Sequence, residues 1–481
     1  MRTSVLILAS LSLATAVVVA PPRLIRRDPL TLADTSKTIT FTVWGMPFED
    51  RLFLDGYAKG FEKAEPGVRV DYQRHAGNEL NMKYTSWHAA GRGAEVMRIQ
   101  IVDYHQMVAR RMLEPLDAFI RDPEHGLSPE RLADFPPYLI EALTIDGKLY
   151  ALPEDNAAFG LYYNKDLFDA YNAANPSDRV EYPHAGWTWD DLRGTARKLT
   201  KRDSSGRIEI HGLDMVIWQW PFMSFFAQAG GRQWNEDGTR TLISERAADG
   251  GKGPGVIALE FLHALVYEDR SWSPSFGRNE GTGPDARFAA GHSAMYLDGS
   301  WMAANFENRN PSLRFAVAPV PRGRIPAVLT GSCLWGIASH AANKEAGWRM
   351  IRWLTAPEQA ARYWDALRVA PPASLSVVRS PAFRATAGIS RAGRTGEFEV
   401  PPMPESLFAD RAAWLLYGYE PDAATGRAPG FVPTGLHQRL LEDEIGRMLQ
   451  EFLGSPGASP EAALDQAAAA VNAVAAKART R

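Results

Sequence analysis

The sequence predicts an α/β protein that divides into more than one lobe. Thr38 to Trp44, TITFTVW, alternates apolar and threonine side chains as a β-strand does; an amphipathic helix follows over residues 51–62, and a second strand runs from Val68 to Tyr72. Strand, helix and strand at this spacing form a βαβ unit, which implies a parallel sheet with helices on its faces. A chain of 481 residues is long for a single hydrophobic core, so we expect two or more lobes.

The same alternation of strands and helices continues along the chain. A third strand is expected from Glu95 to Ile101. The hydroxyl of Thr188 makes it a good N-cap for a helix that ends at Leu199. Two aspartates in the first turn of this helix also favour it, because they complement the helix dipole. Residues 381–433, rich in Pro, Gly, Ala and Arg, indicate a long irregular connection. The other helices are predicted at residues 81–90, 343–354 and 358–367 and, with a proline in its first turn, from Ser459 onward.

The composition is that of an ordinary globular protein. The chain is 45% hydrophobic and 23% charged, with a formal net charge of −3. This charge balance argues against a nucleic-acid binder. Cys333 is the only cysteine, so an intramolecular disulfide and a cysteine-rich metal site are both excluded, and a small buried side chain is expected there. We expect no metal and no cofactor.

Residues 1–37 are predicted to be a signal segment and linker. Val5 to Ala20 is an apolar run, and Ala14 to Ala16 fits a small-x-small cleavage site. Three arginines follow the run and outnumber the charge before it, so an uncleaved anchor is the alternative. No cysteine lies near the cleavage region, so a lipoprotein is not expected. The favoured interpretation is export to a periplasm.

The stretch Arg287 to Trp301, RFAAGHSAMYLDGSW, is the most informative single motif. It predicts a short helix carrying Phe288, a turn at Gly291, a strand from Ser293 to Leu297 and a loop that presents Trp301. A strand that ends in a small-residue loop and an aromatic ring can offer a flat apolar face to a ligand at the carboxyl edge of a sheet. The alternative is a buried strand followed by a core tryptophan.

Several motifs, in this order along the chain, resemble one family. They include ITFTVWG, FEKAEPGVRVDYQ, DGKLYALPEDNAAFGLYYNKDLF, GWTWDDLRGTARKLT, RFAAGHSAMYLDGSW and NKEAGWRMIRWLTAPEQAARYW, and together they span residues 38–475. The chain resembles the carbohydrate-type extracellular solute-binding proteins of ABC importers, the group that includes maltose-binding protein. It departs from the usual pattern in three places. Glu95 stands where the family usually has Asp, residues 175–186 are somewhat long, and residues 381–433 do not align.

The resemblance implies a two-lobed periplasmic-binding-protein fold, each lobe a mostly parallel sheet flanked by helices. Such a protein is not an enzyme. It captures a sugar or oligosaccharide in a cleft between its lobes, acts as a monomer and delivers its ligand to the permease subunits of an ABC transporter. The expected crossings between lobes lie near residues 149–156, 329–338 and 369–373. The lobe boundaries expected from these crossings are 38–152 plus 338–371 for the N-terminal lobe and 153–337 plus 372–481 for the C-terminal lobe.

The chemistry of a saccharide selects the candidate binding residues. A sugar presents ring faces with C–H groups and a rim of hydroxyls, so its site needs aromatic planes together with carboxylates and amides. Each candidate also has a structural alternative: the tryptophans can belong to the core, Glu95 can cap the entry of its strand, and one of Trp218 and Trp220 is expected to contact the ligand. The candidates stand at or near the two ends of predicted strands, at the crossings and, for Trp218 and Trp220, just before a helix where the resemblance implies stacking rings; they are Trp44, Glu95, Tyr104, Asp155, Asn156, Trp218, Trp220, Asp298, Trp301 and Arg368.

Other functions remain as alternatives. A secreted glycoside hydrolase needs two carboxylates on either side of the scissile bond, and Glu95 with Asp155 or Asp298 is the pairing the residues allow. Motifs of zinc proteases, serine hydrolases and phosphate-cradling loops are absent from the sequence. A binder of polyols or glycerol-phosphate esters, and a chemoreceptor ligand carrier without its own importer, are the remaining alternatives.

Overall fold

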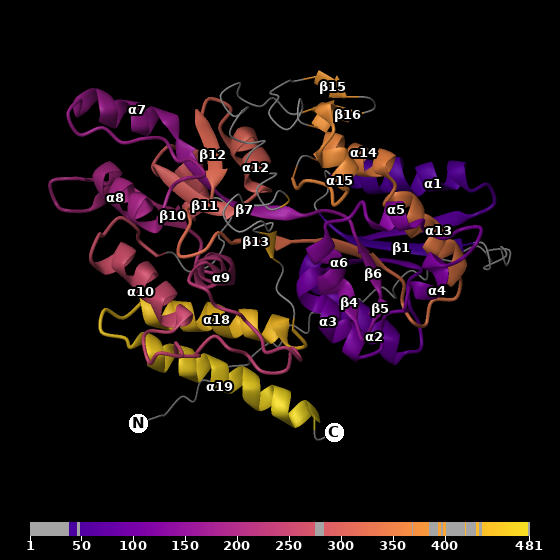
Figure 1. The fold of residues 1–481 in the computed structure, drawn as a ribbon. Coiled ribbons are helices and arrows are strands. Elements are labelled where there is room, and N and C mark those ends of the chain that lie inside the picture. Colours follow the sequence, from indigo (N-terminus) through magenta and orange to yellow (C-terminus); the bar gives the residue numbers. More distant parts are fainter. Residues whose placement is uncertain are drawn as a thin grey trace, which may run out of the picture. The chain divides into compact units, whose positions relative to one another are not determined.

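The computed structural model describes residues 38–45, 49–274, 283–367, 369–383, 393–395, 398–400, 419, 430–431 and 435–479. The predicted signal segment, residues 1–37, and the candidate Arg368 lie outside these ranges. Within them the chain forms two lobes, each with its own sheet and hydrophobic core (Figure 1). None of the helices in these ranges combines the length and the apolar character that crossing a membrane requires.

The first sheet has the strand order β2-β1-β3-β14-β6. β1 (Thr38–Trp44) pairs in parallel with β2 (Arg69–His75) on one side and with β3 (Val96–Gln100) on the other. β14 (Cys333–Gly336) then runs antiparallel to β3 and to β6 (Ala151–Pro153). The βαβ unit predicted at the amino-terminal end is therefore confirmed, and a segment far along the sequence completes the sheet.

Burial on both faces of β1 explains why helices cover this sheet, since Thr42, on the face opposite to Phe41, is also 0% exposed. Ile39, Phe41 and Val43 of β1 are all fully buried, as is expected for a strand inside a helix-covered parallel sheet. The predicted helix over residues 51–62 instead begins with π-helical winding before it becomes α-helical. The longer helices of this lobe are η3 (Arg51–Ala58), α1 (Lys59–Ala64), α2 (Gly77–Ala89), α3 (Ile101–Ala109), α13 (Lys344–Leu354) and α14 (Pro357–Leu367).

The second sheet is built around β7 (Ala157–Asn164), every residue of which is buried. β7 pairs antiparallel with β11 (Met295–Gly299), β12 (Phe315–Pro319) and β13 (Val328–Gly331). The parallel pairs in this sheet are β10–β11 and β13–β17. The expectation of a mostly parallel sheet is thus wrong for this lobe, because β7 enters from the other lobe and runs against its neighbours.

Helices also cover the second sheet. Thr188 caps α8 as predicted: its hydroxyl accepts from the Asp191 backbone N–H at 3.3 Å, and the Asp191 carboxylate accepts from the Thr188 backbone N–H at 2.8 Å. The two C-terminal helices, yellow in Figure 1, pack on each other and on α10. The longer helices are α7 (Lys165–Ala174), α8 (Trp189–Leu199), α9 (Gln219–Gln228), α10 (Pro254–Tyr267), α11 (Pro284–Ala289), α12 (Met302–Arg309), α18 (Gln438–Leu453) and α19 (Pro460–Arg479).

The remaining described elements are short. Three of them, β15, β16 and β17, fall inside the predicted irregular connection over residues 381–433, most of which lies outside the described ranges. The short elements are α4 (Asp117–Ile120), α5 (Pro129–Leu132), α6 (Pro137–Leu143), α15 (Leu375–Val378), β4 (Thr144–Ile145), β5 (Lys148–Leu149), β8 (Lys201–Arg202), β9 (Ile208–Ile210), β10 (Asp214–Met215), β15 (Gly393–Thr395), β16 (Phe398–Val400) and β17 (Gly430–Phe431).

The crossing segments between the lobes lie against one another. The first joins β6 to β7 through residues 154–156, and the second joins β13 to β14 through Ser332. The Glu154 N–H donates to the Cys333 carbonyl at 2.8 Å, and the Asn156 N–H donates to the Pro371 carbonyl at 2.8 Å. All three predicted crossing regions are thereby hydrogen-bonded together, while the residue boundaries of the lobes stay a prediction.

Candidate functional site

Three tryptophans from two separate segments form one cluster in the second lobe. Trp218 and Trp220 flank the start of α9, and Trp301 stands two residues beyond the end of β11, at the N-cap of α12. The rings of Trp218 and Trp220 stack with 5.3 Å between centroids and 2° between planes. Trp301 stands edge-on to both, at 6.2 Å and 78° from Trp218 and at 5.3 Å and 77° from Trp220. These are favourable geometries for aromatic pairs, so the three rings support one another.

Two glycines allow these rings to lie close to the strands. A Cβ at Gly299 would lie 2.1 Å from the Trp301 ring, and a Cβ at Gly331 would lie 2.5 Å from the Trp220 ring. Trp220 is 8% exposed, whereas Trp218 and Trp301 are only partly buried against the core. Trp218 and Trp301 therefore keep surface that a ligand can cover. Trp220 serves mainly as their support.

Trp44, the aromatic candidate of the first lobe, lies beside a buried arginine. The Arg98 guanidinium lies 4.8 Å from the Trp44 ring centroid and 4.7 Å from that of Phe53, and its Nη1 donates to the Trp44 carbonyl at 2.8 Å. Arg98 is 2% exposed, and its charge is balanced by Glu154 at 2.7 Å and Glu49 at 3.8 Å. The sequence analysis missed Arg98. An arginine inside the apolar strand VMRIQ is the signal that could have revealed it, since a buried charge needs partners.

The carboxylates of the first crossing are buried at the junction of the lobes. Asp155 accepts from the Cys333 N–H and from the Tyr363 hydroxyl, both at 2.8 Å. Burial raises the pKa of Glu154 to about 8 and also raises the pKa of Asp155, in spite of the nearby Arg98 charge. Asn156 is 0% exposed and donates to the Tyr138 hydroxyl at 2.5 Å. Asp155 and Asn156 thus hold the crossings together, and their contact with a ligand stays a prediction.

Three of the predicted site residues form hydrogen bonds within their own lobe. Both Glu95 oxygens accept backbone N–H groups, from Thr40 at 2.7 Å and from Ala342 at 3.0 Å. Tyr104 is 0% exposed, and its hydroxyl donates to the Leu143 carbonyl at 2.6 Å. Asp298 is 1% exposed and accepts from the Tyr296 hydroxyl and the Gly299 N–H, both at 2.8 Å. These hydrogen bonds give Glu95, Tyr104 and Asp298 a structural role, and their contact with a ligand stays a prediction.

An ion pair that the sequence analysis did not predict joins the lobes. Arg439, near the start of α18 in the second lobe, contacts the Asp103 carboxylate of α3 in the first lobe at 2.8 Å. It also donates to the Gln100 side chain at 2.8 Å. The Asn81 amide donates to the same Asp103 carboxylate at 2.5 Å. Direct polar contact between the lobes therefore exists away from the crossing segments.

A cavity of about 1380 Å³ lies between segments of the two lobes. Its described lining includes Tyr150 and His105 from the first lobe and Trp234, Asn235 and Phe431 from the second. None of the described candidate residues is among its lining residues. The tryptophan cluster and this cavity are thus two distinct places at which a ligand could meet aromatic and polar side chains.

Glu442 links α18 to the tryptophan cluster. Its carboxyl group should also make the free energy of unfolding depend on pH. It is 4% exposed, and its carboxylate accepts from Gln219, which lies between Trp218 and Trp220 in the chain, at 2.7 Å. Burial raises the pKa of Glu442 from its ordinary 4.5 to about 7. Between these two values the folded state keeps a proton that the unfolded state releases. The stability that the protonated carboxyl contributes therefore falls as pH rises through about 7.

We expect Glu442→Gln to remove this dependence. Between about pH 4.5 and about pH 7, the unfolding free energy of the native protein should fall relative to that of the variant by up to about 1.4 kcal/mol per pH unit, and it should level off above that range. Urea unfolding of both proteins across this range measures the difference. Burial lowers the pKa of several histidines, among them His105 and His437, but both proteins contain them, so their effect cancels. A difference that stays constant with pH would contradict the prediction.

The chain has two lobes, each with its own sheet. Three crossings join the lobes, and aromatic rings stand at strand ends. These features define the two-lobed class of extracytoplasmic binding proteins. Comparison with known proteins agrees with this class. The family model of bacterial extracellular solute-binding proteins matches residues 48–361, more than half of the chain. The chain belongs to this family.

Individual relatives are distant in sequence and close in fold. The mannitol-binding protein of Pseudomonas aeruginosa is 25% identical over 364 residues, which cover 73% of this chain and 77% of that protein. The sugar-binding protein MalE of the phytopathogen Xanthomonas citri superposes with a TM-score of 0.70 at 20% identity, covering 92% of this chain and 98% of that one. A substrate-binding protein of Listeria monocytogenes in complex with cycloalternan gives 0.68 at 22% identity, with 91% and 98% covered.

Proposed function

We propose that this protein captures a neutral saccharide or a related polyhydroxy compound between its lobes and delivers it to the permease subunits of an ABC importer. The observation that carries this proposal is the cluster of Trp218, Trp220 and Trp301 at the strand ends of the second lobe. Membership of a solute-binding family supports transport. The mannitol, sugar and cycloalternan ligands named for similar proteins support the polyhydroxy class. The protein would act in the periplasm as a monomer.

Physical chemistry favours a neutral ligand at the tryptophan cluster. The face of a sugar ring is lined with C–H groups, and indole planes cover such a face while excluding water. Trp218 and Trp301 keep exposed surface, and Trp44 is the aromatic plane that the first lobe offers at the end of β1. Arg98, the cation nearest to Trp44, is already paired with Glu154 and Glu49. A phosphorylated ligand would need an uncommitted cation, so the polyol and sugar alternatives are preferred over a glycerol-phosphate ester.

The proposal excludes hydrolysis of the ligand. A glycoside hydrolase needs two carboxylates that face the scissile bond. Glu95 and Asp298, two of the three acids considered for that role, accept hydrogen bonds within their own lobes, and Asp155 is bound to the second crossing. Incubation with chromogenic glycosides should therefore give no turnover under conditions in which a sugar raises the melting temperature.

A thermal-shift screen over sugars and polyols tests the proposal, because a ligand that binds only the folded state stabilises it by mass action. We expect at least one compound of the panel to raise the melting temperature. Trp301→Ala should then weaken that compound's binding by about 1–3 kcal/mol, roughly tenfold to a hundredfold or more in Kd. Titration calorimetry on both proteins measures the loss. A panel without any stabilising sugar or polyol would count against the function itself.

Tyr150→Ala is the matched control for Trp301→Ala. Tyr150 is a partly buried aromatic residue that lines the interlobe cavity rather than the tryptophan cluster. If the ligand occupies the tryptophan cluster, Tyr150→Ala should leave Kd within about twofold, a change of under 0.5 kcal/mol. A large loss for Tyr150→Ala with normal binding by Trp301→Ala would move the site to the cavity. A large drop in the melting temperature of unliganded Trp301→Ala with normal affinity would place Trp301 in the core.

A further inference from the structure

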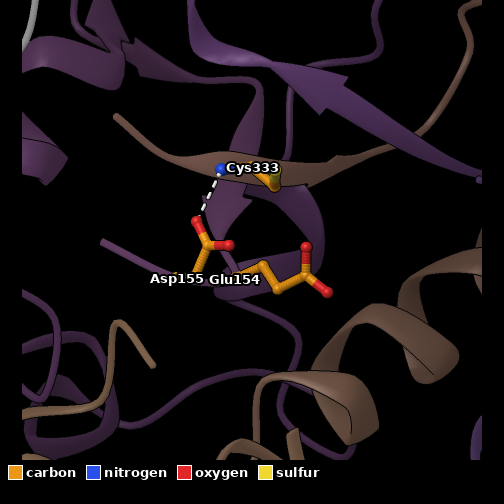
Figure 2. A group of neighbouring side chains, drawn as sticks. All are labelled: Glu154, Asp155 and Cys333. Carbon is orange, nitrogen blue, oxygen red and sulfur yellow. Dashed lines mark hydrogen bonds between the residues drawn. The ribbon is translucent and has the colours of Figure 1, made fainter. Parts of the chain in front are cut away.

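The first and second crossing segments bring three side chains with metal-binding atoms together. Glu154 and Asp155 belong to the first crossing, and Cys333 begins β14 immediately after the second. One ligand atom from each residue lies within 4.8 Å of the corresponding atoms of the other two. Figure 2 shows the group, with the Glu154 side chain extending alongside Asp155 and one of its oxygens turned toward the strand that carries Cys333. The residues are adjacent only because the two crossings pass each other.

One atom of this group lacks a hydrogen-bond partner. Glu154 is 7% exposed, and its Oε1 is buried without a partner among the described residues, while Oε2 accepts from Arg98 at 2.7 Å. A buried carboxylate oxygen without a donor is costly. A cation shared with Asp155 and Cys333 would satisfy it.

The surroundings already orient the ligands. Asp155 is held by the Cys333 N–H and the Tyr363 hydroxyl, both at 2.8 Å. Outer hydrogen bonds of this kind fix the carboxylates that ligate metals.

We propose that Glu154, Asp155 and Cys333 form a binding site for a thiophilic divalent cation of the zinc class at the junction of the crossing segments. A cysteine sulfur with two carboxylate oxygens suits zinc rather than magnesium or calcium, which take oxygen ligands. Zinc bonds of about 2.0–2.3 Å place neighbouring ligands roughly 3.5 Å apart, so small side-chain rotations would close the group around an ion. The ion would fasten the first crossing to the second. The group shares Asp155 with the predicted sugar-binding residues, but it contains none of the three tryptophans that carry the sugar proposal.

Cobalt and zinc titrations of the full chain, without a polyhistidine tag and after chelator treatment and dialysis, test the site. Co²⁺ should produce a thiolate-to-metal charge-transfer absorption that Cys333→Ser abolishes. Calorimetry with ZnCl₂ should show one tight site per chain that weakens on the order of a hundredfold or more in Cys333→Ser and Glu154→Gln, since even outer partners contribute roughly 10- to 100-fold. Tyr363→Phe, which removes only such a partner, should weaken zinc binding by roughly 10- to 100-fold.

Controls separate this site from zinc bound elsewhere. The rings of His88 and His340 lie 4.8 Å apart and offer the ion two imidazoles, so His340→Gln should leave the cobalt–thiolate absorption and the tight zinc site unchanged. A cooperative thermal unfolding transition of each metal-free variant confirms that it is folded. Absence of the thiolate absorption in the native protein, or equal zinc affinity of the native protein, Cys333→Ser and Glu154→Gln, would overturn the proposal.

Discussion

Replacing Arg98 by alanine should lower the unfolding free energy by about 3–5 kcal/mol, the usual cost of removing one partner from a buried ion pair. Arg98 is 2% exposed, and its guanidinium is the positive charge beside Glu154 at 2.7 Å and Glu49 at 3.8 Å. The variant would leave these carboxylates buried without a counter-charge and would remove the cation that covers the Trp44 and Phe53 rings. Denaturant unfolding of Arg98→Ala and of the native protein measures the loss.

Arg314→Ala is the matched control for this loss of a cation. Arg314 is an exposed arginine that pairs with Asp166 at 2.6 Å and with Asp169 at 3.5 Å. Exposed ion pairs contribute about 0–1 kcal/mol, so Arg314→Ala should change stability by no more than that. If Arg98→Ala were as mild as Arg314→Ala, the buried cluster at the crossings would not hold the fold together as we infer.

Trp335→Ala should produce a loss of similar size for a different reason. Trp335 is 1% exposed, and its ring packs against Phe41 at 5.5 Å and Phe53 at 6.3 Å between centroids. Truncating such a side chain removes its transfer free energy and leaves a cavity, at a cost of about 3–5 kcal/mol. Because β14 continues from the second crossing, the same measurement reports on how firmly that crossing is anchored in the first lobe.

Trp87→Ala provides the comparison for a tryptophan at the periphery. Trp87 is only partly buried, and Lys83 covers its ring at 4.5 Å. Its truncation should cost clearly less than that of Trp335, since less apolar surface returns to water. Equal losses for the two variants would contradict the position of Trp335 in the core.

Much of the secondary structure could be predicted from the sequence because the signals are local. The alternation in TITFTVW predicts β1, and Thr188 with Asp191 three residues later predicts the start of α8, since a cap needs only neighbouring residues. The register of β7 could not be predicted. Every residue of β7 is buried, so no alternation distinguishes its faces or its partners, and its antiparallel pairing with β11, β12 and β13 depends on distant segments.

The candidate site also contains residues that a local sequence pattern predicts and residues whose role depends on distant partners. Trp301 was predicted from the loop after a strand, and Trp218 and Trp220 from their place before a helix together with the family resemblance; the fold brings the three rings into contact. The structural partners of Glu95 could not be predicted, because the backbone groups that its carboxylate accepts from include Ala342, 247 residues away. Whether a carboxylate faces a ligand or serves the fold is decided by such partners, which a local pattern does not contain.

The sequence by itself determined the α/β class, the order of the main strands and helices, the solute-binding family and the aromatic residues of the proposed site. These follow from local periodicity, capping and motifs. Only the tertiary structure decided that Arg98 lies between Glu49 and Glu154, that Arg439 reaches Asp103, and that Cys333 meets Glu154 and Asp155. Each of these depends on segments that are distant in sequence and adjacent in space, and the charge and burial of a polar side chain are set by that adjacency.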